Sequence, residues 1–268
     1  MKKATHKSAS PVLNNRSLAT DFSTLTPILQ RGLRVLDVGC GTGAITKDIA
    51  ERVGEKGTVV GIDQSKELIE EGKALFDFPA NLELINIGLF EYEPSEKFDL
   101  IVSARVLQWL NNPQTAVQKM KTWLRPNGQI SILDYNHEAL AWTPEPPESM
   151  QEFYQAFLDW RASLGLNNAI ADDLAGYFEG AGFQQIAVIP ANEVYQKGAD
   201  NFLHKAGIWI EVAKSVGPKM IAAGFTTESL RQQAMRDHQT WIETEAEEMV
   251  MQLNDVRGSS VNTKTKLI

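Results

Sequence analysis

Three glycines alternate with other residues in the segment VLDVGCGTG, which spans residues 35–43. Glycine has no Cβ, so it adopts positive φ values and lets the backbone come close to a ligand. An amphipathic run over 44–53 follows at once, and a helix N-terminus presents unpaired N–H groups with a partial positive charge. The segment therefore predicts a strand, a glycine loop and a helix that together receive a polar ligand.

Two carboxylates accompany this loop. Asp37 stands two residues before the first glycine, and Asp63 ends a second apolar run, TVVGID, twenty residues after Gly43. Two adjacent parallel strands would bring Asp63 beside the loop, where its carboxylate can accept hydrogen bonds from both hydroxyls of a ribose. We therefore expect the ligand to contain a nucleoside.

A nicotinamide dinucleotide makes similar demands on a protein. The spacing Gly39-x-Gly41-x-x-Ala44 satisfies the loose form of the dinucleotide-binding fingerprint. However, Asp37 is badly placed for a pyrophosphate, and the sequence contains no Tyr-x-x-x-Lys of a short-chain dehydrogenase. An NAD-dependent oxidoreductase therefore remains the less favoured alternative.

Several motifs in a fixed order resemble those of class I S-adenosylmethionine-dependent methyltransferases. The segment 37–43 with Asp63 resembles motif I and the acidic residue that follows it, and FDLIVS at 98–103 resembles the fourth strand. LRPNGQ at 124–129 is similar to the turn before the fifth strand. LQWL at 107–110 is similar to the small-molecule branch, which includes trans-aconitate and biotin-pathway methyltransferases. The resemblance covers about 34–189 and 249–256.

The resemblance implies S-adenosyl-L-methionine as the cofactor. Asp37 would face its methionine end, Asp63 its ribose and Gln64 its adenosine. The family often has an acidic residue at the adenine amine, where this chain reads NIGLF at 86–90, so Glu91 or a backbone carbonyl would replace it. The implied cofactor residues are Asp37, Gly39, Cys40, Gly41, Gly43, Asp63, Gln64, Gly88, Leu89, Phe90, Ser103 and Arg105.

Apolar runs alternate with amphipathic ones along the chain, which predicts a parallel sheet covered by helices on both faces. The expected fold is an α/β, Rossmann-like sheet of seven mostly parallel strands with an antiparallel last strand. Strands are predicted at 34–38, 58–63, 82–87, 98–103, 129–135, 183–189 and 249–256. Helices are predicted at 24–30, 44–53, 65–76, from 113, and at 148–164 and 172–181, with two or three more within 200–247.

The predicted domain organisation is simple. Residues 1–20 are polar and are expected to form a mobile arm, and 259–268 a loose tail. A single methyltransferase domain would span 21–258, with helical insertions at about 138–165 and 200–247. These insertions are expected to form a helical cap over the carboxyl edge of the sheet and to enclose a small substrate.

The candidates for catalysis follow the predicted strands. A sulfonium methyl group is already activated, so its transfer needs chiefly an in-line approach, and a base only where the acceptor must lose a proton. Tyr135, His137 and Glu138, just past the fifth strand, are the candidate bases and orienting groups, although His137 also fits a solvated loop residue. Arg105 either binds a substrate carboxylate or pairs with a surface acid. The candidate residues of the substrate pocket are Trp109, Tyr135, His137, Trp142 and Trp209.

The amino-acid composition limits which classes of partner and which surroundings suit the protein. The net charge of −8, from 26 basic and 34 acidic side chains, disfavours a nucleic-acid partner. No apolar run approaches a membrane span of about 20 residues, and the first residues lack the apolar stretch of a signal peptide. Cys40 is the single cysteine, which excludes an intrachain disulfide, fits a cytoplasmic protein and argues against a metal site.

The sequence therefore predicts methyl transfer from S-adenosyl-L-methionine to a small-molecule acceptor. A non-catalytic module that binds S-adenosylmethionine or S-adenosylhomocysteine is the main alternative. The oligomeric state stays open.

Overall fold

The computed structural model describes residues 10–260, which divide into two compact units. The larger unit comprises Ser10–Asp134, Ile170–Ala191 and 254–260. The smaller unit comprises Tyr135–Ala169 and Asn192–Leu253.

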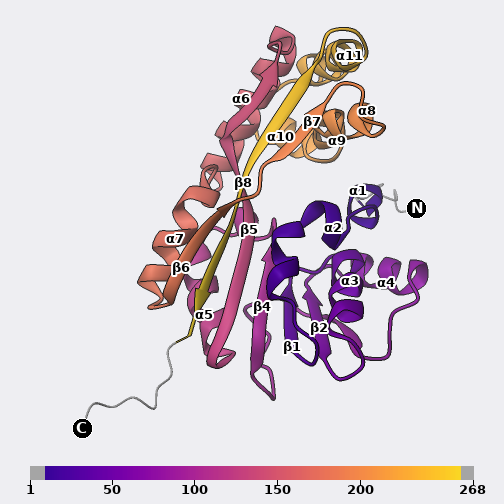
Figure 1. Ribbon diagram of the computed structural model, residues 1–268. Coiled ribbons are helices and arrows are strands. Elements are labelled where there is room, and N and C mark those ends of the chain that lie inside the picture. Colours follow the sequence, from indigo (N-terminus) through magenta and orange to yellow (C-terminus); the bar gives the residue numbers. More distant parts are fainter. Residues whose placement is uncertain (1–9, 261–268) are drawn as a thin grey trace, which may run out of the picture. The chain divides into compact units, whose positions relative to one another are not determined.

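The sheet begins with five parallel strands. The first four match their predicted bounds to within one residue, whereas the fifth starts five residues earlier and ends eight residues later than predicted. These five strands are β1 (Arg34–Val38), β2 (Thr58–Asp63), β3 (Leu82–Asn86), β4 (Phe98–Ala104) and β5 (Leu124–Thr143). The later strands are β6 (Gln184–Pro190), β7 (Glu193–Gln196) and β8 (Glu248–Ser259), and β8 pairs antiparallel with both β6 and β7. The strand order is β3-β2-β1-β4-β5-β8-β6, with β7 beside β8 (Figure 1). The predicted fold class is confirmed, and residues 10–260 form eight strands in place of the seven predicted.

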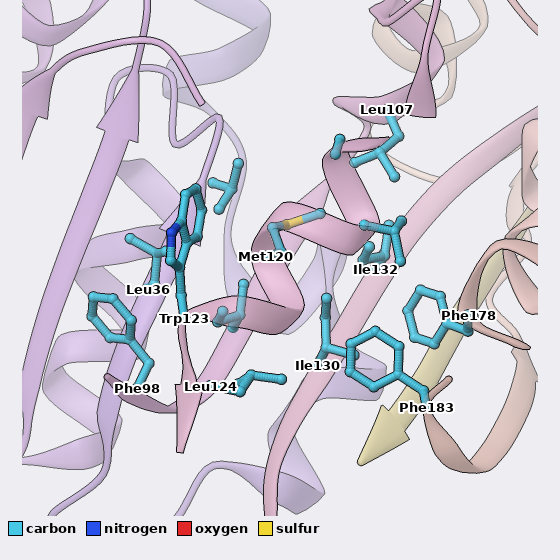
Figure 2. Close-up of a cluster of buried hydrophobic side chains, with 14 of the residues drawn as sticks. Leu36, Phe98, Leu107, Met120, Trp123, Leu124, Ile130, Ile132, Phe178 and Phe183 are labelled. Carbon is cyan, nitrogen blue, oxygen red and sulfur yellow. The ribbon is translucent and has the colours of Figure 1, made fainter. Parts of the chain in front are cut away.

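Apolar side chains of the larger unit cover the two faces of its strands. Leu36, Ile130 and Ile132 belong to a cluster with Met120 of α5 (Pro113–Thr122) and Phe178 of α7 (Ile170–Gly180), as Figure 2 shows. Side chains alternate along a strand, so residues such as Val35 and Val59 face the other way. On that side, α3 (Ala44–Val53) packs on β2, and α4 (Lys66–Leu75) packs on β2 and β3. These helices hold rigid the strand ends that carry the site.

The helix boundaries follow local chemistry. The Asn112 side chain accepts a hydrogen bond from the Thr115 N–H at 3.2 Å, and Pro113 occupies the first turn of α5, where a missing N–H costs nothing. Ser65 caps α4 in the same way through the Leu68 N–H at 3.3 Å. The predicted start of this helix at residue 113 is therefore confirmed.

The N-terminal segment differs from the expected mobile arm. Residues 1–9 lie outside the described chain, but α1 (Ser10–Asn14), α2 (Leu18–Asp21) and the 3₁₀ helix η1 (Ser23–Ile28) are formed. Leu18 is buried, and its N–H donates to Asp48 Oδ2 at 2.8 Å. The apolar side chains here are too few for a periodic stripe, so their burial depends on contacts with distant residues.

The smaller unit contains more helices than predicted, and its first insertion begins as a strand. β5 continues to Thr143 before α6 (Glu148–Ser163), so the segment from 138 is not helical at its start. The second insertion holds α8 (Phe202–Ala206), α9 (Ile208–Ser215), α10 (Gly217–Ala222) and α11 (Glu228–Thr244). Breaks at Gly207 and near Gly217 separate α8, α9 and α10. The apolar spacing of the sequence did not reveal these breaks, so fewer and longer helices were predicted. The core of the four helices contains Phe202, Ala206, Ile210, Trp241, Ile242 and Ala246.

Two further differences concern strands. β7 has only four residues, and their burial alternates between intermediate and exposed. The sequence therefore contains no apolar run that would predict this strand. The first two residues of the expected tail are instead ordered by the sheet: Ser259 lies in β8, and the Ser260 N–H donates to Gly128 O at 2.9 Å. The rest of the expected tail, 261–268, lies outside the described residues. Within residues 10–260, no helix combines the length and the apolarity of a membrane span.

Candidate cofactor site

The glycine loop closes the end of β1 in the larger unit. Gly39, Gly41 and Gly43 have φ values of 75°, 58° and 80°, which residues with a Cβ rarely adopt. A Cβ on Gly39 would also lie 2.3 Å from Val106 Cγ2. The N–H groups of Gly39 and Cys40 donate to Ile62 O at 2.8 and 3.0 Å. The loop is therefore bound to the end of β2, the strand that carries Asp63.

The Asp63 carboxylate points toward this loop. Its Oδ2 accepts from the Gly41 N–H at 2.9 Å, and its Oδ1 accepts from the Ser65 N–H at 2.8 Å. A carboxylate offers about four acceptor positions, so two remain for other donors. This geometry suits the ribose role that the resemblance implied.

Asp37 is the buried acid of the site. Thr46 Oγ1 donates to its Oδ2 at 2.6 Å. Burial raises the pKa of Asp37 to about 6, against the lowering effect of the Thr46 hydrogen bond and with a further increase from the Asp63 charge. Above pH 6 the site thus holds a buried negative charge, which suits a cationic group of a ligand.

A cavity opens at the loop within the larger unit. Thr42, in the loop, is almost fully buried, and within the described chain its Oγ1 has no hydrogen-bond partner. A buried hydroxyl of this kind fits a polar ligand better than an apolar one. The cavity is lined by Leu13, Arg16, Phe22, Asp37, Gly39, Cys40, Gly41, Thr42, Ala44, Ile45 and Ala104.

Sequence analysis missed part of this lining. Leu13, Arg16 and Phe22 come from the segment expected to be mobile, and no motif marked them. Gly72 of α4 was missed as well: a Cβ there would lie 1.9 Å from Thr42 O, so α4 needs this glycine to approach the loop backbone. The sequence did offer one indication of Gly72: it stands inside a predicted helix. Glycine destabilises a helix, so its presence there suggests that close packing requires it.

The residues expected at the adenosine lie after β2 and β3. Gln64 is exposed directly after Asp63, and its carbonyl accepts from Asn86 Nδ2 at 3.0 Å. The Glu91 carboxylate folds over Gly88, where a Cβ would lie 2.2 Å from Glu91 Oε2. Leu89 packs against the core cluster, and Phe90 is 44% exposed. Glu91 is therefore near the place where the family's acidic residue was missing.

Three other expected cofactor residues have contacts of their own. Burial raises the pKa of the Cys40 thiol, so it stays protonated. Ser103 is fully buried, and its hydroxyl donates to Val38 O at 2.9 Å.

Arg105, with a φ of 62°, is buried and donates from Nη2 to Asp21 O at 2.9 Å. Arg105 therefore does not lie at the surface, where the sequence had allowed it to pair with an acid. The hydrogen bond to Asp21 O joins the end of β4 to α2.

His137 lies in the smaller unit, on β5 and not in a solvated loop. It is buried, its N–H donates to Asn168 O at 2.7 Å, and the Tyr154 hydroxyl donates to its carbonyl. Its ring lies 5.7 Å from Phe157 and 6.2 Å from Trp209, measured between centroids. Burial, followed by the charge of Arg161, lowers the pKa of His137 to about 3. The imidazole is therefore neutral at physiological pH and a weak base.

The other candidates for the substrate pocket do not share one environment. Trp209 is 1% exposed and lies against the rings of His137 and Phe157. The Trp142 ring packs edge-on against Tyr154, with 5.1 Å between the ring centroids. Trp109 belongs to the larger unit and is 49% exposed. The structure therefore brings Tyr135, His137, Trp142 and Trp209 into the smaller unit and leaves Trp109 out.

Glu193 of β7 is a polar group that sequence analysis did not single out. Its Oε2 accepts from the hydroxyls of Tyr135 at 3.3 Å and Tyr195 at 2.5 Å. A carboxylate shared by two phenols gives Tyr135 an oriented hydroxyl. In the sequence, only the alternation of Glu193 and Tyr195 along a short strand could have indicated this carboxylate.

Comparison with known proteins places the chain in a family. The methyltransferase domain family matches residues 29–206. The chain belongs to this family. The prediction of a class I methyltransferase is confirmed at the level of this family.

Two curated relatives and one solved structure illustrate the similarity. The malonyl-[acyl-carrier protein] O-methyltransferase of Halalkalibacterium halodurans is 27% identical over 136 residues, 49% of this chain and 46% of that protein. The aklanonic acid methyltransferase DauC of a Streptomyces species is 30% identical over 169 residues, 58% of this chain and 76% of DauC.

A putative methyltransferase from Bacillus halodurans matches the fold with a TM-score of 0.54 at 16% identity, over 90% of this chain and 99% of that one. The first curated relatives are longer: the chain spans 46% of one and 30% of the next. Family membership and fold are therefore shown.

Proposed function

We propose that the protein transfers a methyl group from S-adenosyl-L-methionine to a small-molecule acceptor. The orientation of Asp63 carries this proposal: its carboxylate is held toward the Gly41 N–H of a loop built from positive-φ glycines. Asp63 would hold the ribose hydroxyls, Asp37 the cationic amino group and Thr42 Oγ1 a further polar atom. The bound cofactor supplies an activated methyl group on a positively charged sulfur.

The protein's own contribution is to position the reactants. The glycine loop is fixed by hydrogen bonds to Ile62 O, and Ser103 fixes the neighbouring end of β4 through Val38 O. Preorganised groups of this kind lower the entropic cost of reaction by several kcal/mol, about 7 or more in favourable cases. Glu91 is proposed at the adenine amine, because its carboxylate lies over Gly88.

The names of the relatives support a small acceptor. They include a methyltransferase of aklanonic acid and one of malonyl-[acyl-carrier protein], in which the small malonyl group is carried on a protein. The net charge of −8 also disfavours binding of a polyanion such as nucleic acid.

Tyr135 is the favoured candidate among the residues considered for proton transfer. His137 has a pKa lowered to about 3, and Arg105 is a permanent cation whose side chain donates to Asp21 O. The Tyr135 hydroxyl would accept the acceptor's proton as its own proton passes to Glu193 Oε2. Where the acceptor atom carries no proton to lose, this pair would orient the acceptor only.

Calorimetric titration tests the cofactor. S-Adenosylmethionine should bind, and Asp63→Ala should weaken the binding by about 1–3 kcal/mol because ribose hydroxyls lose their partner. Asp77→Ala, at an exposed position, is the matched control and should bind like the native protein. Binding of NAD without S-adenosylmethionine would reject the proposal. Tight cofactor binding without turnover on a broad acceptor panel would favour the non-catalytic alternative.

A further inference from the structure

We propose that Arg16 binds the α-carboxylate of the cofactor's methionine end and forms a two-charge clamp with Asp37. The inference rests on the proposed function, because it assumes a ligand with a free amino-acid group. It assigns a cofactor role to the N-terminal segment, in which no motif marked a site.

The charges that line the cavity carry the proposal. Among the described lining residues, Arg16 is the only cation and Asp37 the only acid. A methionine end carries one carboxylate and one ammonium group, so one charge of each sign matches it. Asp63, which suits the ribose, is absent from that lining, whereas Ala104 at the end of β4 is present. The cavity therefore corresponds to the amino-acid end of the ligand.

The backbone on both sides of Arg16 is anchored. Two residues earlier, Asn14 Nδ2 donates to Glu71 Oε1 of α4 at 2.8 Å. Two residues later, the Leu18 N–H donates to Asp48 Oδ2 of α3 at 2.8 Å. Leu13 packs against the loop, since a Cβ on Gly41 would lie 3.6 Å from Leu13 Cδ1. These contacts place Arg16 at the cavity before a ligand arrives, which reduces the entropy lost on binding.

Arginine is suited to this role. Its planar guanidinium donates two parallel hydrogen bonds to a carboxylate and keeps its charge at every relevant pH. Lysine would retain the charge and lose the paired geometry. Arg16→Lys should therefore bind with an affinity between those of the native protein and Arg16→Ala.

The test compares ligands that differ in the carboxylate. S-Adenosylhomocysteine carries it, decarboxylated S-adenosylmethionine keeps the amine without it, and 5′-methylthioadenosine lacks the whole amino-acid group. Calorimetric titration of Arg16→Ala should show binding of S-adenosylhomocysteine weakened about 10- to 100-fold, as expected for a lost charge-assisted contact. Binding of the two ligands without a carboxylate should change less than threefold.

Arg52→Ala, at an exposed position of α3, is the matched control and should bind all three ligands like the native protein. Equal weakening of all three ligands by Arg16→Ala would overturn the proposal, because Arg16 would then only shape the segment. Unchanged binding of S-adenosylhomocysteine would also overturn it. Should Arg16→Ala unfold, Arg16→Gln applies the same comparison. If the native protein binds none of the three ligands, the proposed function itself fails.

Discussion

Both units bury a titratable group with a strongly shifted pKa, but the two groups end in different states. Asp37 of the larger unit has a pKa raised to about 6, and His137 of the smaller unit has a pKa lowered to about 3. Burial is the largest cause in both cases, since it disfavours the charged form. At pH 7, however, Asp37 is charged while His137 is neutral.

This difference separates a binding group from a packing group. A shifted pKa alone would mark both residues as functional candidates. The larger unit keeps a charge in a buried position beside a cavity, where a cationic ligand can compensate it. The smaller unit keeps its imidazole neutral among aromatic rings, where no charge needs compensation.

Asp37→Asn should have the largest effect on stability. Because the native pKa exceeds the unfolded value of 3.8, Asp37 favours folding below pH 4, and this contribution disappears as the pH rises through about 6. Asn carries no charge and can still accept from Thr46, so at pH 8 the free energy of unfolding should rise by about 3 kcal/mol. Chemical denaturation at pH 8 and pH 4 measures this, with the gain absent at pH 4.

The same variant should bind S-adenosylmethionine more weakly, which would link the stability gain to lost function. Exposed Asp77→Asn is the control and should change neither property. A variant that is no more stable than the native protein at pH 8 would remove the contrast between the two units.

His137→Phe should have the next largest effect, with the opposite dependence on pH. The lowered pKa means that His137 favours folding above its unfolded pKa of 6.5, and this contribution is lost progressively as the pH falls toward 3. At pH 5 the native protein should have lost about 2 kcal/mol through this residue, and the variant should not show that loss. Unfolding curves at pH 7.5 and pH 5 give the difference directly.

The comparison between pH values cancels any constant packing change in the variant. The hydrogen bonds to Asn168 O and from Tyr154 use the main chain of residue 137 and can persist. His204, exposed on α8, supplies the matched replacement, His204→Phe, which should keep the native pH dependence. An unchanged pH dependence in His137→Phe would show that the imidazole is not held neutral.

Tyr154→Phe should have a smaller effect, of about 1 kcal/mol on the free energy of unfolding. The phenol donates to His137 O, and burial raises its pKa, so its hydroxyl stays protonated. The loss of stability should be the same from pH 6 to pH 9, because the Tyr154 phenol stays largely protonated over this range in both the folded and the unfolded protein. A loss that grows with pH in thermal unfolding would contradict a Tyr154 phenol that stays protonated.

The exposed ion pairs should show no contrast between the units. Lys66–Glu70 in the larger unit and Lys214–Glu211 in the smaller unit join exposed side chains at 3.5 and 2.7 Å. Lys66→Ala and Lys214→Ala should each change the free energy of unfolding by about 0.5 kcal/mol or less. A larger loss in one unit alone would mean that the contrast extends beyond buried groups.

Some features were predictable because they depend on local chemistry. The glycine loop, the strand ending at Asp63 and the Asn112 cap each arise from residues close together in sequence. By contrast, Glu193 meets Tyr135 across 58 residues, and Gly72 meets Thr42 across 30. No local pattern encodes such pairs, because each side contributes only one residue.

The sequence by itself determined the strand–loop–helix corner, the two acids around it and the family to which they belong, since backbone conformation and motif spacing are local properties. Tertiary structure alone decided that Arg16 lines the cavity, that Asp37 titrates near pH 6 and that His137 stays neutral. Burial and neighbouring charges, which chain folding brings from distant positions, set these properties. The same carboxyl or imidazole therefore has no fixed role until its surroundings are assembled.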